Sequence, residues 1–306
     1  MRDPDDANRL TAAESRRLES EYTRFRIVEL ALDPVRGNFD AAHLREINRR
    51  IFQDLPGLGF RDVTPGQYRP AVSPGKDWNK QRRLDSVGAH SYVAYSPMDK
   101  AAQARLDKAL KEANPTALAK LDTAAFTQSM ADLYAELDYL HPFPDGNSRT
   151  LRTFTKQLAQ GAGYNLDWAR FNANESSRDL LSIARDRAVT ELALPHIRDV
   201  ETARSVVYSM DRLENNPGLY DLLRDAIRPS RALAFEHLPQ ARALQKHPEL
   251  AKSYDALHVA AQALTKKLPG NEAAQREALS MFKKEIQTRL DEGEAPQKTR
   301  GRSRSR

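Results

Sequence analysis

The sequence predicts an all-α fold with one small β-hairpin, and three observations support this fold class. Apolar residues recur at spacings of three and four through most of the 306 residues, as they do on one face of a helix. Residues that cap helices stand where several of these runs begin. Prolines and glycines are dense over residues 54–100, where one short run has the composition of a strand. No run of about 18 apolar residues occurs, so we expect no membrane span.

The first two helices follow from their caps. Thr11 and Glu14 have the spacing of a capping box, in which each side chain bonds a free backbone N–H of the first turn. Asp33 should end this helix, because it precedes a proline and such residues avoid the helical region. Asp40 can cap a second helix. The expected apolar faces are Leu18, Tyr22, Phe25, Val28 and Leu32 on the first helix, and Leu44, Ile47 and Ile51 on the second.

The middle of the chain places one short segment between two helices. A strand-like run forms the second half of a hairpin that we expect over residues 84–95. Helical spacing over residues 126–140 should stop at His141, which precedes a proline. Another helix follows and ends near Gly161. Residues 141–152 therefore span a loop and the start of a helix.

The last third of the chain reads as a separate helical module. A turn signal at residues 215–218 comes before three helical faces, which predict a bundle over residues 217–290. We therefore divide the chain into a domain at 1–200, this bundle, and a basic tail at 291–306. The net charge is +6, but residues 298–306 hold five cations and no acid, so the near-neutral body does not favour a nucleic-acid partner. The tail reads as a disordered, solubilising end, with a translocation signal or a weak nucleic-acid contact as alternatives.

The segment that begins at His141 contains the parts of a phosphate-transfer site. The start of a helix offers unpaired backbone N–H groups and a positive dipole end, and Gly146 lets the backbone approach an anion. Arg149 and Arg152 would share a helix face, where two guanidinium groups can hold a polyphosphate. Asp145 is an oxygen ligand of the kind that Mg²⁺ prefers. His141 itself can accept a proton near neutral pH.

These residues resemble the Fic family motif, which is written HPFx(D/E)GNGRxxR. The matching residues are His141, Pro142, Phe143, Asp145, Gly146, Asn147, Arg149 and Arg152. Ser148 departs from the motif, which has glycine at that place. Residues 38–44, 65–69 and 163–168 are similar to other segments of the family, and the expected hairpin lies where Fic proteins carry a flap that positions the target. The resemblance covers about residues 10–200 and implies a Fic-fold helical domain with a small β-hairpin flap.

The resemblance implies a role for each motif residue. His141 would take the proton of a target hydroxyl, which attacks the α-phosphorus of ATP while pyrophosphate leaves. Asp145 would hold Mg²⁺ across the α- and β-phosphates. Tyr92 and Val93 could be plain core residues, or the flap edge on which a target segment docks by strand addition. The residues that would bind the nucleotide are Gly146, Asn147, Ser148, Arg149 and Arg152.

Many Fic proteins are inhibited by a glutamate in the pattern (S/T)xxxE(G/N), which pairs with the second motif arginine and blocks productive ATP binding. That arginine is Arg152 here. The nearest match runs from Ser15 to Glu19, and a weaker one ends at Glu214. Both glutamates could equally be surface charges on helices. If neither acts, the resemblance implies a separate small antitoxin that supplies the glutamate.

The resemblance as a whole implies a protein adenylyltransferase that uses ATP and Mg²⁺ to move AMP onto a hydroxyl of another protein. Ser148 leaves open the transfer of a different group, such as UMP or phosphocholine. A degenerate helical interaction module is the non-enzymatic alternative, which the intact His141 and Asp145 disfavour. The absence of cysteine and of a signal peptide fits a cytoplasmic protein. The basic tail and bundle resemble those of Fic effectors exported by type IV secretion, which implies a partner in that machinery and translocation into a host or recipient cell.

Overall fold

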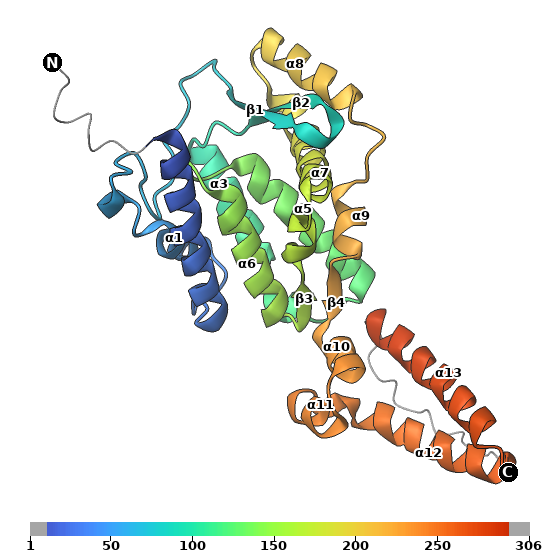
Figure 1. Ribbon diagram of the computed structural model, residues 1–306. Coiled ribbons are helices and arrows are strands. Elements are labelled where there is room, and N and C mark those ends of the chain that lie inside the picture. Colours follow the sequence, from blue (N-terminus) through green and yellow to red (C-terminus); the bar gives the residue numbers. More distant parts are fainter. Residues whose placement is uncertain (1–10, 294–306) are drawn as a thin grey trace, which may run out of the picture.

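The computed structural model describes residues 11–293, which are mostly helical (Figure 1). The all-α fold with a small hairpin that the sequence predicts is therefore confirmed. None of the helices in this part of the chain is long and apolar enough to cross a membrane. The helices are α1 (Ala12–Leu32), α2 (Ala41–Phe52), α3 (Lys100–Glu112), α4 (Pro115–Leu118), α5 (Thr123–Leu140), α6 (Asn147–Gly161), α7 (Glu175–Ala193), α8 (Val200–Asp211), α9 (Leu219–Arg224), α10 (Ser230–His237), α11 (Gln240–Lys246), α12 (Ala251–Lys267) and α13 (Glu272–Asp291).

The core of the body forms around α5, which packs against α3, α6, α7 and α9. The aromatic side chains of Phe126 and Tyr134 on α5 and Phe154 on α6 are completely buried. Burying an aromatic or aliphatic side chain of this size contributes about 1.5–3 kcal/mol each. Because α5 and α6 are the two helices that the motif joins, this core fixes both sides of the loop between them.

Helix α1 begins and ends as the sequence predicts, but the face that it buries is not the apolar face that the spacing predicts. The capping box of Thr11 and Glu14 is present, and the helix ends at Leu32. Helix α1 packs against α2 and buries Thr23 and Leu30. Most of the apolar face that the spacing predicts is instead exposed, at Tyr22, Phe25, Val28 and Leu32. Spacing identifies an apolar face, but it does not say whether this chain covers it.

The hairpin is longer than the sequence predicts. Its strands are β1 (Trp78–Leu84) and β2 (Ala89–Tyr95), so the expected start at residue 84 is wrong. The strands are antiparallel, with Trp78 opposite Tyr95 and Leu84 opposite Ala89. Strand β1 lacks β-branched residues and is mostly polar, so its composition does not read as a strand. Two of its inward side chains nevertheless find polar partners in the body, because Lys80 lies beside His141 and Arg82 pairs with Asp186.

The C-terminal third divides between the body and a projecting helical part. Leu219 and Leu223 of α9 belong to the main core, and Ile227 lies in strand β4 (Ile227–Pro229), which pairs with β3 (Tyr164–Leu166). The first part of the bundle expected over residues 217–290 therefore packs on the body and includes a short strand. Helices α10 to α13 extend away from the body (Figure 1) and have their own small apolar cluster. The division of the chain into domains stays a prediction, and most of the expected tail lies outside the described residues.

Candidate active site

The histidine of the motif lies at the end of α5 in a left-handed conformation. Its φ is 44°, and its backbone N–H donates to the carbonyl oxygen of Leu137. Arg69 holds this turn in place, because its guanidinium donates to the carbonyl oxygens of His141 (2.7 Å) and Ser96 (2.5 Å). Arg69 also stacks over the Trp78 ring at 4.5 Å. A buried arginine therefore satisfies carbonyl groups that the helix end leaves unpaired.

The imidazole of His141 is enclosed by groups from three directions. Its ring centroid lies 4.0 Å from that of Tyr95 on β2. Its Nε2 lies 3.1 Å from Nζ of Lys80 on β1, and its Nδ1 lies 3.8 Å from the carboxylate of Asp138 on α5. Burial lowers the pKa of His141 to about 4, although Asp138 acts to raise it. The imidazole is therefore neutral at pH 7 and able to accept a proton.

Asp138 forms a buried ion pair with Arg185 of α7. The guanidinium contacts both carboxylate oxygens, at 3.0 and 3.1 Å. Burial alone would raise the pKa of Asp138, but the charges of Arg185 and His141 outweigh it and lower the pKa to about 2. A buried carboxylate needs such a partner, because an unpaired charge in the interior is costly. The pair fixes a negative charge beside the imidazole.

The loop between the two helices is closed by its own side chains. The Asn147 side chain accepts from the N–H of Phe143 (3.0 Å) and donates to its carbonyl oxygen (2.7 Å). Phe143 is completely buried. Gly146 has a φ of 73°, and a Cβ there would lie 1.9 Å from the Phe52 ring, so no other residue fits. The loop therefore delivers free backbone N–H groups at the start of α6.

Ser148, where the motif has glycine, joins two arginines. Its hydroxyl accepts from Arg152 (2.9 Å) and from Arg185 (3.2 Å). Arg185 thereby links the start of α6 to Asp138. Sequence reasoning missed Asp138, Arg185 and Lys80, because each one comes to the site from outside the motif and no pattern marks it. Arg69 ends the 65–69 segment that resembles the family, but no role at the site was predicted for it from the sequence.

The two glutamates singled out in the sequence have different surroundings. Glu19 of α1 pairs with Arg149, at 2.5 Å, and Thr23 accepts from the same guanidinium at 3.0 Å. The pairing with Arg152 that the resemblance implies is therefore not the one found. Glu214 is exposed beyond the end of α8.

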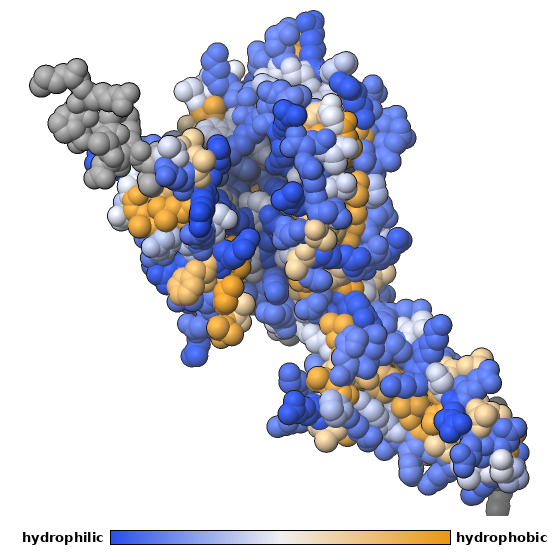
Figure 2. Space-filling model, in the orientation of Figure 1, coloured by the Kyte–Doolittle hydropathy of each residue, from blue (hydrophilic) through white to orange (hydrophobic). Residues whose placement is uncertain are grey.

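The motif arginines line a cavity of about 570 Å³ between α1 and α6. Figure 2 shows this hollow beside α1. The cations along its wall are Arg24, Arg149, Arg152, Lys156 and Arg178. Anionic groups of a ligand would be favoured in such a cavity.

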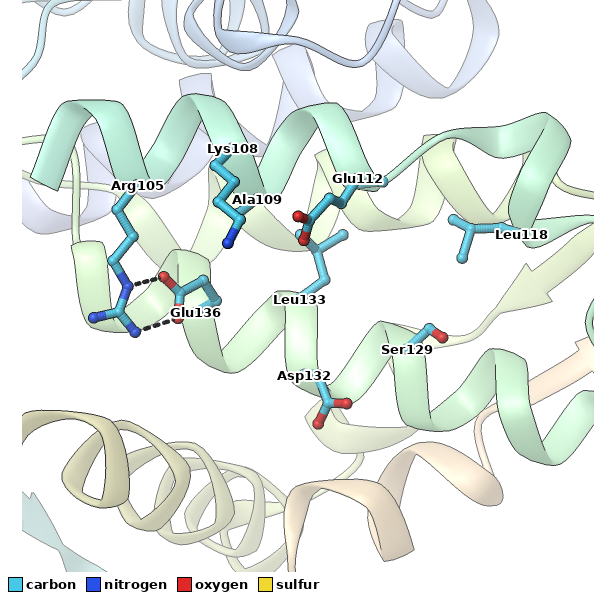
Figure 3. Close-up of a pocket in the computed structure, with 10 residues that line it drawn as sticks. Arg105, Lys108, Ala109, Glu112, Leu118, Ser129, Asp132, Leu133 and Glu136 are labelled. Atoms are coloured by element: carbon cyan, nitrogen blue, oxygen red, sulfur yellow. Dashed lines mark hydrogen bonds and ion pairs between the residues drawn. The ribbon is translucent and has the colours of Figure 1, made fainter.

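A second cavity, of about 520 Å³, lies between α3 and α5 (Figure 3). Arg105 and Glu136 pair with each other on its wall, and Lys108 and Glu112 also line it. The motif residues do not line this cavity. It is therefore a surface groove with charges of both signs, apart from the site around His141.

The hairpin presents β1 rather than β2 as its open edge. Val93 is only 2% exposed and packs in an apolar cluster, so its side chain is not available to a target. The N–H of Tyr92 donates to Ser209 of α8, which covers that side of β2. Within residues 11–293, β1 pairs with β2 alone. An added strand would therefore meet β1.

Asp145 is exposed at the tip of the loop, and its Oδ1 accepts from the N–H of Gly146 at 2.6 Å. Over the described residues, no group of three or more histidine or carboxylate side chains could hold a metal ion. Mg²⁺ is commonly held by one or two carboxylates together with substrate phosphates. Asp145 fits that role, as one ligand shared with a phosphate.

Comparisons with known proteins agree with the motif. The Fic/DOC family model matches residues 38–159. The chain is 31% identical over 196 residues to the protein adenylyltransferase VbhT of Bartonella schoenbuchensis. This alignment covers 60% of this chain and only 36% of that protein. It is 30% identical over 167 residues to the probable protein adenylyltransferase Fic of Escherichia coli. This second alignment covers 53% of this chain and 70% of that protein.

One solved structure that aligns with this chain is BepC, a VirB-translocated effector of Bartonella tribocorum, determined with bound AMPPNP. It is 18% identical, has a TM-score of 0.46, and the alignment covers 72% of this chain and 89% of that one. The sequence relatives carry the assignment. On the family match and the identity to the Escherichia coli protein, this chain belongs to the Fic/DOC family.

Proposed function

We propose that this chain transfers AMP from ATP onto a hydroxyl side chain of another protein, with His141 as the general base. The observation that carries the proposal is a neutral, buried histidine at the end of α5, next to the start of α6. The names of the sequence relatives, which are protein adenylyltransferases, support the same reaction. A base of this kind contributes about 10²–10⁴-fold to a rate.

The nucleotide phosphates bind at the start of α6 in this proposal. The backbone N–H groups after Gly146 receive the phosphate that reacts, and Arg149 and Arg152 hold the outer phosphates. Asp145 would hold Mg²⁺ together with the phosphates, and the ion would supply positive charge that neutralises them. Ser148 holds the Arg152 side chain in place through its hydroxyl, beside the phosphates in this proposal.

The target protein adds a strand to the outer edge of β1. Main-chain hydrogen bonds supply affinity in this mode of recognition, and side chains at alternate positions supply specificity. The Trp78–Leu84 strand lies over the site, because Lys80 reaches His141 from it. A hydroxyl on the added strand would therefore arrive near Nε2.

Glu19 holds the enzyme inactive by occupying Arg149. The ion pair removes one phosphate-binding guanidinium, and it places a carboxylate where phosphate oxygens would lie. A separate antitoxin is the alternative source of inhibition. The cationic cavity beside α1 would suit an acidic segment of such a partner.

The test is labelling of a cell lysate with purified protein, Mg²⁺ and labelled ATP, UTP or GTP. We expect transfer from ATP by the Glu19→Gly variant, with about 10³-fold less labelling after His141→Ala, because the base is lost. Transfer from UTP alone would replace the proposal with uridylylation. A lack of His141-dependent labelling from any nucleotide would favour a degenerate interaction module instead.

The helices α10 to α13 and the basic tail serve delivery rather than catalysis in this proposal. The tail holds five cations over residues 298–306. A type IV secretion machinery would be the partner, and translocation into another cell the result. Loss of export with intact labelling after removal of this part would support the assignment, whereas export without it would contradict it.

A further inference from the structure

Strand β1 brings into the site a lysine that the proposed mechanism leaves unused. Lys80 lies on the inward side of β1, between the exposed residues Asn79 and Gln81. Its Nζ lies 3.1 Å from Nε2 of His141, the nitrogen that must accept the proton. A target hydroxyl can reach Nε2 only if the ammonium leaves that position.

Asp145 is the carboxylate that attracts the Lys80 ammonium most strongly. Burial lowers the pKa of Lys80, and the largest charge effect on it is the attraction of Asp145, which acts in the opposite direction. An ammonium carries three donors, and His141 takes only one of them. The Asp145 carboxylate therefore attracts Lys80, and the reacting phosphate is proposed to bind beside that carboxylate.

We propose that Lys80 is a further catalytic residue, which covers Nε2 of His141 at rest and contacts the transferred phosphoryl group during the reaction. The inference rests on the proposed AMP transfer. The hydroxyl oxygen of the target forms a bond to the α-phosphorus, and its proton passes to Nε2. The bond from that phosphorus to pyrophosphate breaks, and pyrophosphate leaves with the electron pair. Lys80 keeps all its protons and donates to a phosphoryl oxygen as negative charge develops there.

The same movement strengthens the base. The groups that face His141 are Lys80 from β1, Tyr95 from β2, Asp138 from α5 and Arg69 from the segment before the hairpin. Burial is the main cause of the low pKa of His141, and the charges of Lys80 and Arg69 lower it further, whereas Asp138 raises it. When the ammonium leaves Nε2, the pKa of His141 rises.

Arg185 of α7 acts on this group through its ion pair with Asp138, and Arg82 of β1 pairs with the buried Asp186. Neither arginine contacts Nε2 of His141 in our proposal. The proposed change in base strength is therefore assigned to Lys80, which lies 3.1 Å from that nitrogen, and a single substitution can test it.

The experiment uses the full chain with Glu19→Gly, so that the α1 ion pair does not limit the rate. Lys80→Met and Lys80→Gln both remove the charge, and Lys76→Met is the matched control at an exposed lysine outside the strand. The readouts are kcat for protein labelling, the melting temperature, and the NMR titration of the His141 imidazole, assigned with His141→Ala. We expect both neutral variants to lose about 100-fold in kcat, as when one oxyanion donor is removed. We also expect their His141 titration to move to higher pH.

Several outcomes would overturn the inference. An unchanged or raised kcat in the neutral variants removes Lys80 from catalysis, and an unchanged titration removes its contact with the base. If Lys80→Met does not fold, Lys80→Gln gives the same two readouts with a polar side chain. If the parent chain transfers no nucleotide, the proposed function fails and the catalytic role of Lys80 with it, whereas the titration still measures the contact. Equal losses after Lys76→Met would assign the effect to general loss of charge.

Discussion

At the scale of single residues, the site depends on a buried ion pair that lies outside the motif. Asp138 sits between His141 and Arg185, and its pKa falls to about 2 from an ordinary 3.8. A carboxylate with a lowered pKa stabilises the fold above its unfolded pKa, and that stability is lost as the pH falls from about 4 towards 2. The pair thus contributes fully at neutral pH.

Asp138→Asn should therefore destabilise the protein and slow transfer. We expect a loss of about 3–5 kcal/mol in the free energy of unfolding, because Arg185 is left as a buried, unpaired charge. We also expect at least about ten-fold slower labelling at pH 7.5, because the imidazolium loses its carboxylate. Urea unfolding and labelling rates measure the two effects. Asp132→Asn, at an exposed position of the same helix, should change neither.

Sequence reasoning found the motif residues but not their partners. His141, Asp145, Arg149 and Arg152 lie within one continuous segment, so spacing was enough to bring them together. Lys80 lies 61 residues before His141, and Arg185 lies 47 residues after its carboxylate partner. Contacts over such separations depend on how helices pack, which a single sequence does not encode as a local pattern.

At the scale of elements, helix α1 inhibits the enzyme in our proposal. Glu19→Gly should raise the rate of labelling by about ten-fold or more, because Arg149 becomes free for phosphate. Glycine also weakens a helix interior by about 1 kcal/mol. Glu21→Gly is therefore the matched control, since Glu21 lies on the same helix and pairs with Arg17 rather than with Arg149. Equal activation by both variants would mean that a loosened α1, and not the carboxylate, is responsible.

The elements that the sequence predicted well are those with strong local signals. The caps at Thr11 and Asp40 and the stops at Leu32 and Leu140 all match the structure. Strand β1 was missed over most of its length, because two of its inward positions, Lys80 and Arg82, are cationic and meet polar groups of the body. The apolar face of α1 was predicted from the spacing of its apolar residues alone, and this spacing does not show which face of the helix is covered by the rest of the chain.

At the scale of the whole molecule, the body extends further along the chain than the motif domain. Leu219, Leu223 and Ile227 are buried in the main core, and β4 completes a sheet with β3. The end of α13 returns to the body, where Thr123 donates its backbone N–H to the carbonyl oxygen of Glu292. The C-terminal helices are thus joined to the body at both ends.

Two truncations should separate these parts. A chain ending at Asn216 should lose several kcal/mol of stability, since each large buried side chain removed costs about 2–5 kcal/mol. A chain ending at Pro229 keeps α9 and β4 and should retain labelling. Thermal unfolding and labelling assays distinguish the two. Equal stability of both chains would show that α9 and β4 are dispensable to the body.

The left-handed turn at His141 has an electrostatic consequence for the reaction. Helix α5 ends at Leu140 and α6 begins at Asn147, so six residues join the negative end of one helix to the positive end of another. In the proposed reaction, proton transfer to the histidine creates a cation at the end of α5, while negative charge grows on the phosphate at the start of α6. Both helices therefore favour the same charge separation. The order of the two helices along the chain gives this short loop a permanent field that matches the transition state.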